Sequence, residues 1–157
     1  MQRAIGLVEE AVGLVNPAAE PVRAAVLRAR LGDYHRVAGN ETGALAAYQE
    51  AERLLAGKPP SAERARVLAG HARTLDLTWR TQEAVRYCEE AIGVARAVGA
   101  RAEEAHALST LGICLDYLGE LDRAGRARSS YFLANTSWRT ATATSGLSLN
   151  SPSTPSL

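Results

Sequence analysis

Small and apolar residues recur at three- and four-residue spacing along most of the chain, which is the spacing of one face of an α-helix. Glycine, proline, serine and threonine interrupt this pattern at intervals, as they do where a helix ends and a turn begins. The pattern is clearest in residues 82–98, where it comprises Ala84, Val85, Cys88, Ala91, Ile92 and Ala95. It predicts an all-α protein of short helices joined by turns.

The helical pattern repeats with a period of about 40 residues, and each unit has two halves. One register is always alanine, and another is always small, as a close crossing between the two helices of a unit requires. The alanines are Ala4, Ala44, Ala84 and Ala124, and the small residues are Gly32, Ala72 and Gly112. A fixed period of this length predicts an α-solenoid of antiparallel helical hairpins, in which stacking buries the core.

The predicted helices divide residues 1–124 into repeat units. A helix over 2–15 comes first and has no partner before it. Two complete hairpins follow over 19–56 and 61–98, and an incomplete third unit covers 101–127. We therefore expect the chain to begin inside a repeat unit.

Capping residues predict where several helices begin and end. Ser61 follows two prolines and can accept a hydrogen bond from the first amides of a helix over 62–77. Thr81 is placed to do the same for a helix starting at Gln82. Gly99 can adopt the left-handed backbone conformation that ends that helix. Local chemistry thus predicts the bounds of the second hairpin.

The repeat units resemble the tetratricopeptide repeat. The matching residues are Leu31-Gly32, Ala44, Tyr48 and Ala51 in the first complete unit, and Leu111-Gly112 and Ala124 in the third. The second unit departs from the pattern with His71-Ala72 and Cys88, and the period exceeds the usual length of about 34 residues. The resemblance implies a curved stack of hairpins that binds a protein or peptide.

Residues 39–55 and 83–124, which are rich in alanine and arginine, resemble more closely the tetratricopeptide-like arm of large actinobacterial regulators. In those proteins an ATPase module precedes the repeats and a LuxR-type helix-turn-helix often follows. The resemblance implies a non-enzymatic sensor or interaction arm of a larger transcription regulator. A free-standing adaptor, a self-association module and an accessory repeat region of an ATPase are the alternatives.

Composition and charge narrow the class of partner. The net charge is +1, which is not typical of a nucleic-acid binder. The chain has no phosphate-loop motif and no evident DNA-reading helix, so we expect no nucleotide, cofactor or direct nucleic-acid binding. No apolar run approaches the roughly 20 residues that span a bilayer, so no membrane partner is expected. Two cysteines are too few for a disulfide scaffold, which favours the cytoplasm.

Histidine and cysteine carry weak functional signals. His35, His71 and His106 lack the paired spacing of a metal site, and His71 falls at a packing position. Cys88 and Cys114 lie inside predicted helices, where buried small residues are expected, although a disulfide or redox role stays open. No nucleophile, base and acid occur at motif spacing, so no catalytic residue and no metal ligand is predicted.

The first helices of the units are expected to line the groove of the solenoid. Arginine can bind carboxylates or phosphates there, and an exposed tyrosine can anchor a partner. The residues expected to face this groove are Asp33, Arg36, Arg66, Arg73, Asp76, His106, Asp116 and Tyr117. The alternative is an ordinary solvated face with compensating charges.

The last part of the chain changes character. Residues 129–157 contain 13 serines or threonines and one charged residue. Arg128 and Tyr131 occupy positions that are aromatic and alanine in the first complete unit. We therefore expect residues 125–157 to be a low-complexity tail, either disordered or produced by a shift of reading frame. The third hairpin would then lack its second helix and fray.

Overall fold

The computed structural model describes residues 2–145, with side chains as far as residue 136. This part of the chain contains seven α-helices and no strand, so the all-α prediction is confirmed. The helices are α1 (Gln2–Leu14), α2 (Pro21–Val37), α3 (Glu41–Leu55), α4 (Ala62–Leu77), α5 (Thr81–Val98), α6 (Arg101–Tyr117) and α7 (Leu121–Ser145).

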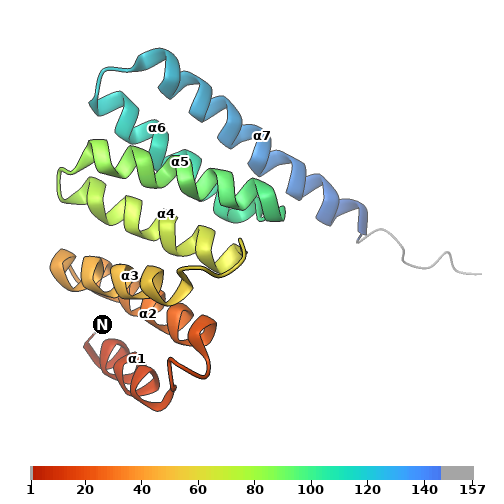
Figure 1. The fold of residues 1–157 in the computed structure, drawn as a ribbon. Helices are drawn as coiled ribbons and strands as arrows, with labels where there is room; N and C mark the ends of the chain where they lie inside the picture. Colours follow the sequence, from red (N-terminus) through yellow and green to blue (C-terminus); the bar gives the residue numbers. More distant parts are fainter. Residues whose placement is uncertain (1, 146–157) are drawn as a thin grey trace, which may run out of the picture.

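The helices stack in chain order, from α1 at one end to α7 at the other (Figure 1). Helix α2 packs against α3, α4 against α5, and α6 against α7, so each pair forms a hairpin. The first helices α2, α4 and α6 also contact one another in turn, and they form one layer. The second helices α3 and α5 pack against the first helix of the following hairpin. This arrangement is compatible with an α-solenoid.

Most of the predicted helix ends agree with the structure. Ser61 caps α4, where its hydroxyl accepts a hydrogen bond of 3.2 Å from the amide of Arg64. Gly99 ends α5 with φ of 69°, as predicted. The prediction for Thr81 was wrong, because α5 already begins at this residue and Arg80 precedes it without a side-chain cap. A residue inside the helix cannot cap it, since its hydroxyl no longer faces the first free amides.

The core of the first hairpin is built around Tyr48, which is fully buried. A Cβ atom added at Gly32 on α2 would lie 2.9 Å from the Tyr48 ring, and one added at Gly70 on α4 would lie 2.5 Å from it. Real Cβ atoms do not approach other atoms this closely. The ring therefore packs against bare backbone on both helices, which explains why both positions are glycine.

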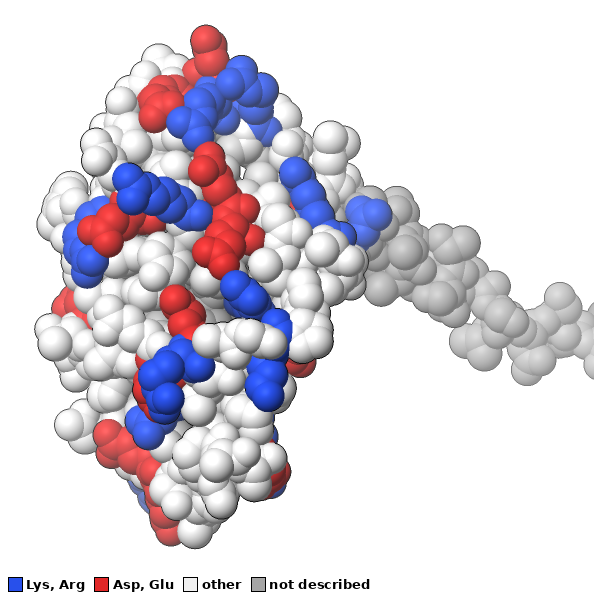
Figure 2. Space-filling view, in the orientation of Figure 1, with Lys and Arg blue, Asp and Glu red and all other residues white. Residues whose placement is uncertain are grey.

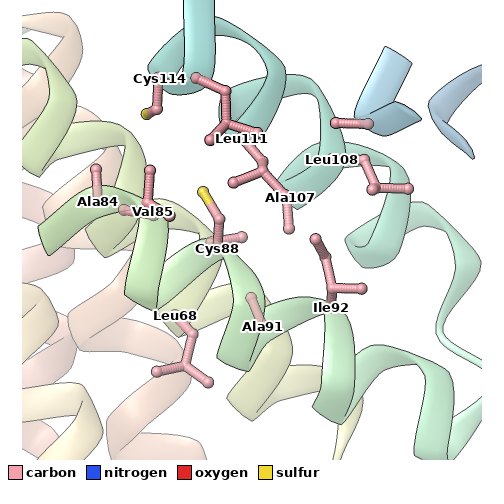
Figure 3. Close-up of a cluster of buried hydrophobic side chains, with 14 of the residues drawn as sticks. Leu68, Ala84, Val85, Cys88, Ala91, Ile92, Ala107, Leu108, Leu111 and Cys114 are labelled. Carbon is pink, nitrogen blue, oxygen red and sulfur yellow. The ribbon is translucent and has the colours of Figure 1, made fainter. Parts of the chain in front are cut away.

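The largest cluster of buried apolar side chains extends from α4 to α7. Val85, Cys88 and Ile92 of α5 lie against Ala107 and Leu111 of α6 (Figure 3). Ala84, Ala91 and Ala95 of α5 are buried as well, so small side chains make up half of the buried residues of this helix.

The third hairpin is complete, which corrects the expected loss of its second helix in residues 125–157. Helix α7 continues to Ser145 and buries Ala124, Ala127 and Ala134 against the core. The hydroxyl of Thr136 donates a hydrogen bond of 2.8 Å to the carbonyl of Phe132 one turn earlier. This bond satisfies the hydroxyl but does not favour the helix, so burial of the alanines is what stabilises α7. The predicted tail at residues 146–157 lies outside the described residues.

Candidate functional site

A pocket of about 310 Å³ hollows the face formed by α2, α4 and α6. We call it the α2/α4/α6 pocket. Its lining residues are Val26, Ala29, Arg30, Asp33, Glu63, Arg66, Val67, Gly70 and His106. Asp33, Arg66 and His106, each predicted to face the groove, are brought together here from three different helices.

Helix geometry explains how these side chains meet. Val26, Arg30 and Asp33 are spaced by four and three residues, so they lie on one face of α2. Arg66 and Gly70 are likewise one turn apart on α4. Gly70 has no side chain to fill the pocket, and the Tyr48 ring lies against its backbone. The pocket therefore has an apolar floor and a charged rim.

Asp33 is held in place by two donors. It accepts a hydrogen bond of 2.8 Å from the Tyr48 hydroxyl, and it forms an ion pair of 3.2 Å with Arg36. Burial raises the pKa of Tyr48, and the Asp33 carboxylate raises it further, so the phenol keeps its proton and donates. The predicted residue Arg36 thus lies beside the pocket and orients one of its lining carboxylates.

Arg66 joins two of the first helices. Its guanidinium on α4 forms an ion pair of 2.7 Å with Glu103 on α6, at a place where the Glu103 side chain is largely covered. Arg66 still lines the pocket with one edge of its side chain. The rim therefore consists partly of charges that the protein itself neutralises.

The other predicted residues do not join this pocket. Asp76 accepts a 3.4 Å contact from the Cys114 thiol, and Asp116 forms an ion pair with Arg128 of α7. Tyr117 lies edge-on to the ring of Trp79, with ring centres 6.3 Å apart. Arg73 lies seven residues after Arg66, two turns along α4. The predicted set is therefore spread along the stack, and only part of it shares one cavity.

Arg30 and Gly70 line the pocket but were not among the residues predicted from the sequence. Arg30 could have been found from its position between Val26 and Asp33 on the same helical face. Gly70 interrupts an otherwise helix-favouring segment, and a glycine inside a helix indicates a close approach. Its partner Tyr48 lies 22 residues away, so the sequence alone does not identify what approaches.

Trp79 was also missed. It has φ of 61° in the turn between α4 and α5, where the turns of the other hairpins have Gly39 and Gly119 with similar positive φ. Its side chain is 80% exposed. A left-handed conformation is unfavourable for a bulky residue, so the indole occupies a strained position with little burial to offset the cost.

A second polar cluster lies between the first two complete hairpins. His71 of α4 is only 2% exposed, which confirms its predicted packing position. Its Nδ1 contacts the Glu52 carboxylate of α3, and the Tyr87 hydroxyl of α5 donates a 3.4 Å hydrogen bond to the same group. The imidazole also stacks near Tyr48. Because these groups satisfy one another, the cluster explains how a histidine is buried here.

The cysteines are both free and buried. The adjacent Cys114 thiol and burial raise the pKa of Cys88, so this thiol stays protonated and poorly nucleophilic. Within residues 2–145 no group of three histidine, cysteine or acidic side chains is arranged to hold a metal ion. In the same range, none of the helices combines the length and apolar character needed to cross a lipid bilayer.

Charged side chains are mixed on the surface. On the face shown in Figure 2, acidic and basic residues alternate and no broad area has a single sign. Charged residues also pair between helices, as Arg64 does with Glu90 at 3.0 Å and Arg123 with Glu89 at 2.7 Å. This face therefore lacks the broad basic surface that phosphate-backbone binding needs.

The sequence matches no protein-family model, and no curated protein matches it either. The α2/α4/α6 pocket is therefore the feature from which we infer a function.

Proposed function

We propose that this chain is a non-enzymatic helical-repeat module that binds a protein or peptide on its α2/α4/α6 face. The observation that carries the proposal is the pocket itself, which three successive first helices line together. A segment crossing this face would contact all three hairpins at once. Apolar pockets with a few polar groups at the rim are typical of recognition sites.

The proposal includes a tetratricopeptide-like repeat with a period of about 40 residues. The packing of Tyr48 against Gly32 supports it, since these residues occupy the aromatic and glycine positions of that repeat. Cys88 and Arg128 follow Tyr48 at successive intervals of 40 residues, and Ala72 and Gly112 follow Gly32 in the same way.

The wider context we propose is an interaction arm of a larger cytoplasmic transcription regulator, in which ATP and DNA are bound by other domains. Sequencing the genomic DNA on both sides of the gene tests this. An ATPase frame upstream and a helix-turn-helix frame downstream would support the regulator. Clean start and stop signals with neither module nearby would favour a free-standing adaptor instead.

Selection from a phage-displayed library of random peptides tests the binding function directly. Selected peptides should bind the wild-type chain and bind more weakly to a variant whose pocket is altered at His106, such as His106→Glu. The matched control is Arg86→Glu, since Arg86 is exposed on α5 in the other layer. Failure to select any peptide, or equal loss in both variants, would refute a binding site on this face.

Self-association is the second candidate. The end helices expose large apolar side chains, Leu7 and Leu14 on α1 and Phe132 and Leu133 on α7. Exposed apolar groups of this kind favour contact between copies. Sedimentation of the chain over a range of concentrations decides between a monomer and a dimer, and the double variant Leu14→Lys/Phe132→Lys should abolish any dimer formed through these ends.

A further inference from the structure

Two arginines at the α2/α4/α6 face have no partner within the described part of the chain. Arg30 of α2 lines the pocket, and Arg73 lies three residues after the pocket residue Gly70 on α4. Neither forms a hydrogen bond or an ion pair there. Their ten N–H donors are available for hydrogen bonds to water, and such bonds are weaker than bonds to a carboxylate.

The neighbouring acids, in contrast, are already satisfied. Asp33 accepts from Tyr48 and Arg36, and Glu103 pairs with Arg66. Hydrogen bonds from its own backbone amide and from the Ser61 hydroxyl lower the pKa of Glu63, which therefore stabilises the start of α4 as a carboxylate. Within the described residues, these acids already accept hydrogen bonds or form an ion pair, whereas the two arginines do neither.

The floor of the pocket is apolar. Val26, Ala29 and Val67 contribute carbon surface, and Gly70 adds no side chain, because the Tyr48 ring lies against its backbone. A volume of about 310 Å³ accommodates one leucine or phenylalanine side chain. A partner that fits both features has an apolar residue for the floor and carboxylates for the rim.

We propose that the partner is an acidic peptide segment whose apolar side chain enters the α2/α4/α6 pocket while flanking carboxylates pair with Arg30 and Arg73. This inference rests on the proposed peptide-binding function and specifies its ligand class. Charge complementarity selects the acidic segment over a basic one, since a basic segment would leave the two arginines facing like charges. The pocket then sets the register of the bound segment.

Fluorescence anisotropy with three labelled synthetic peptides tests the inference. The first contains one leucine flanked by glutamates on both sides, the second has lysines in place of the glutamates, and the third has alanine in place of the leucine. The acidic leucine peptide should bind, and its affinity should fall as salt is added. The other two should bind at least about tenfold more weakly, because each lacks one half of the complementarity.

Variants of the protein locate the contact. Arg30→Glu and Arg73→Glu should each weaken binding of the acidic leucine peptide by at least about tenfold. Arg86→Glu makes the same charge change on the other layer and should alter the affinity by less than about twofold. Circular dichroism and thermal melting should match the wild type, because all three substitutions replace side chains without hydrogen bonds in the described residues.

The outcomes distinguish failure of the acidic partner from failure of the proposed peptide-binding function. Equal binding of the lysine peptide, or equal loss in Arg30→Glu and Arg86→Glu, would overturn the acidic partner. If library selection yields only neutral or basic peptides that Arg30→Glu leaves unaffected, the acidic partner is wrong and peptide binding stands. If neither the library nor the synthetic peptides yield a binder, both proposals fail.

Discussion

The first and second hairpins pack against each other through polar side chains as well as apolar ones. The second and third hairpins pack through small and apolar side chains. Where α3 meets α4, Tyr48 fills the space between two glycines, and the buried His71 pairs with Glu52. Where α5 meets α6, the buried residues Cys88, Ile92 and Leu111 are small or apolar (Figure 3). One architecture therefore accepts a polar junction and an apolar one.

The difference between the junctions is coordinated across helices. Forty residues after Gly32, Tyr48 and Gly70 the chain has Ala72, Cys88 and Thr110. The central side chain is thus smaller in the second junction, and the two residues in place of the glycines are larger. Forty residues after Glu52 and His71 it has Ile92 and Leu111, so both members of the polar pair change together. Side-chain volume and polarity are thus balanced within each junction, as close packing requires.

Truncating the central side chain of each junction should give the largest contrast. Tyr48→Ala removes a buried ring and leaves Asp33 without its phenol donor, so we expect a loss of about 3–5 kcal/mol in the free energy of unfolding. Cys88→Ala removes one sulfur atom and should cost about 1 kcal/mol. Urea denaturation measures both values. Equal losses would show that the two junctions contribute alike and would contradict the contrast.

Adding one methyl group should test the space around Tyr48. Gly70→Ala places a Cβ against the ring and should destabilise by about 1–3 kcal/mol, although alanine favours a helix. In a Tyr48→Cys background the same substitution should be neutral or stabilising, because the ring is gone. A double-mutant cycle measures the coupling. Additive effects would mean that the ring is not what excludes a side chain at position 70.

Removing one member of the His71–Glu52 pair should lower the stability of the fold more than replacing both members with apolar residues. His71→Leu leaves the Glu52 carboxylate with only the Tyr87 hydroxyl, and we expect a loss of about 1–3 kcal/mol. Because the Glu52 side chain is 26% exposed, water limits this loss. The double variant Glu52→Ile/His71→Leu copies the apolar junction and should come within about 1 kcal/mol of the wild type. A double variant less stable than His71→Leu would contradict this explanation.

Substitutions in the turns of the second and third hairpins should have the smallest effect on stability. Trp79→Gly relieves a left-handed conformation that costs about 1–2 kcal/mol. Glycine itself costs about 0.5–1 kcal/mol of conformational entropy, so the net gain should be at most about 1.5 kcal/mol. Gly119→Ala, at the matching turn of the third hairpin, should instead lose about 1 kcal/mol. Thermal unfolding that ranks the two variants in the opposite order would remove the argument for strain at Trp79.

Part of the candidate site could be predicted from the sequence. The spacing of Asp33, Arg66 and His106 relative to the small residues placed them on one face, and the pocket brings them together. The same reasoning placed Asp116 there, but this carboxylate pairs with Arg128 on the next helix. Spacing identifies the helix face on which a residue lies. It does not identify which neighbour takes its charge.

The sequence by itself determined where most helices begin and end, because caps such as Ser61 and Gly99 act within a few residues of the chain. Only the tertiary structure decided that residues 121–145 form a second helix, since burial of Ala127 and Ala134 against the core stabilises a segment of weak helical propensity. It also decided which arginines stay unpaired on the α2/α4/α6 face. Contacts between helices determine this, and they join residues that lie tens of positions apart in the chain.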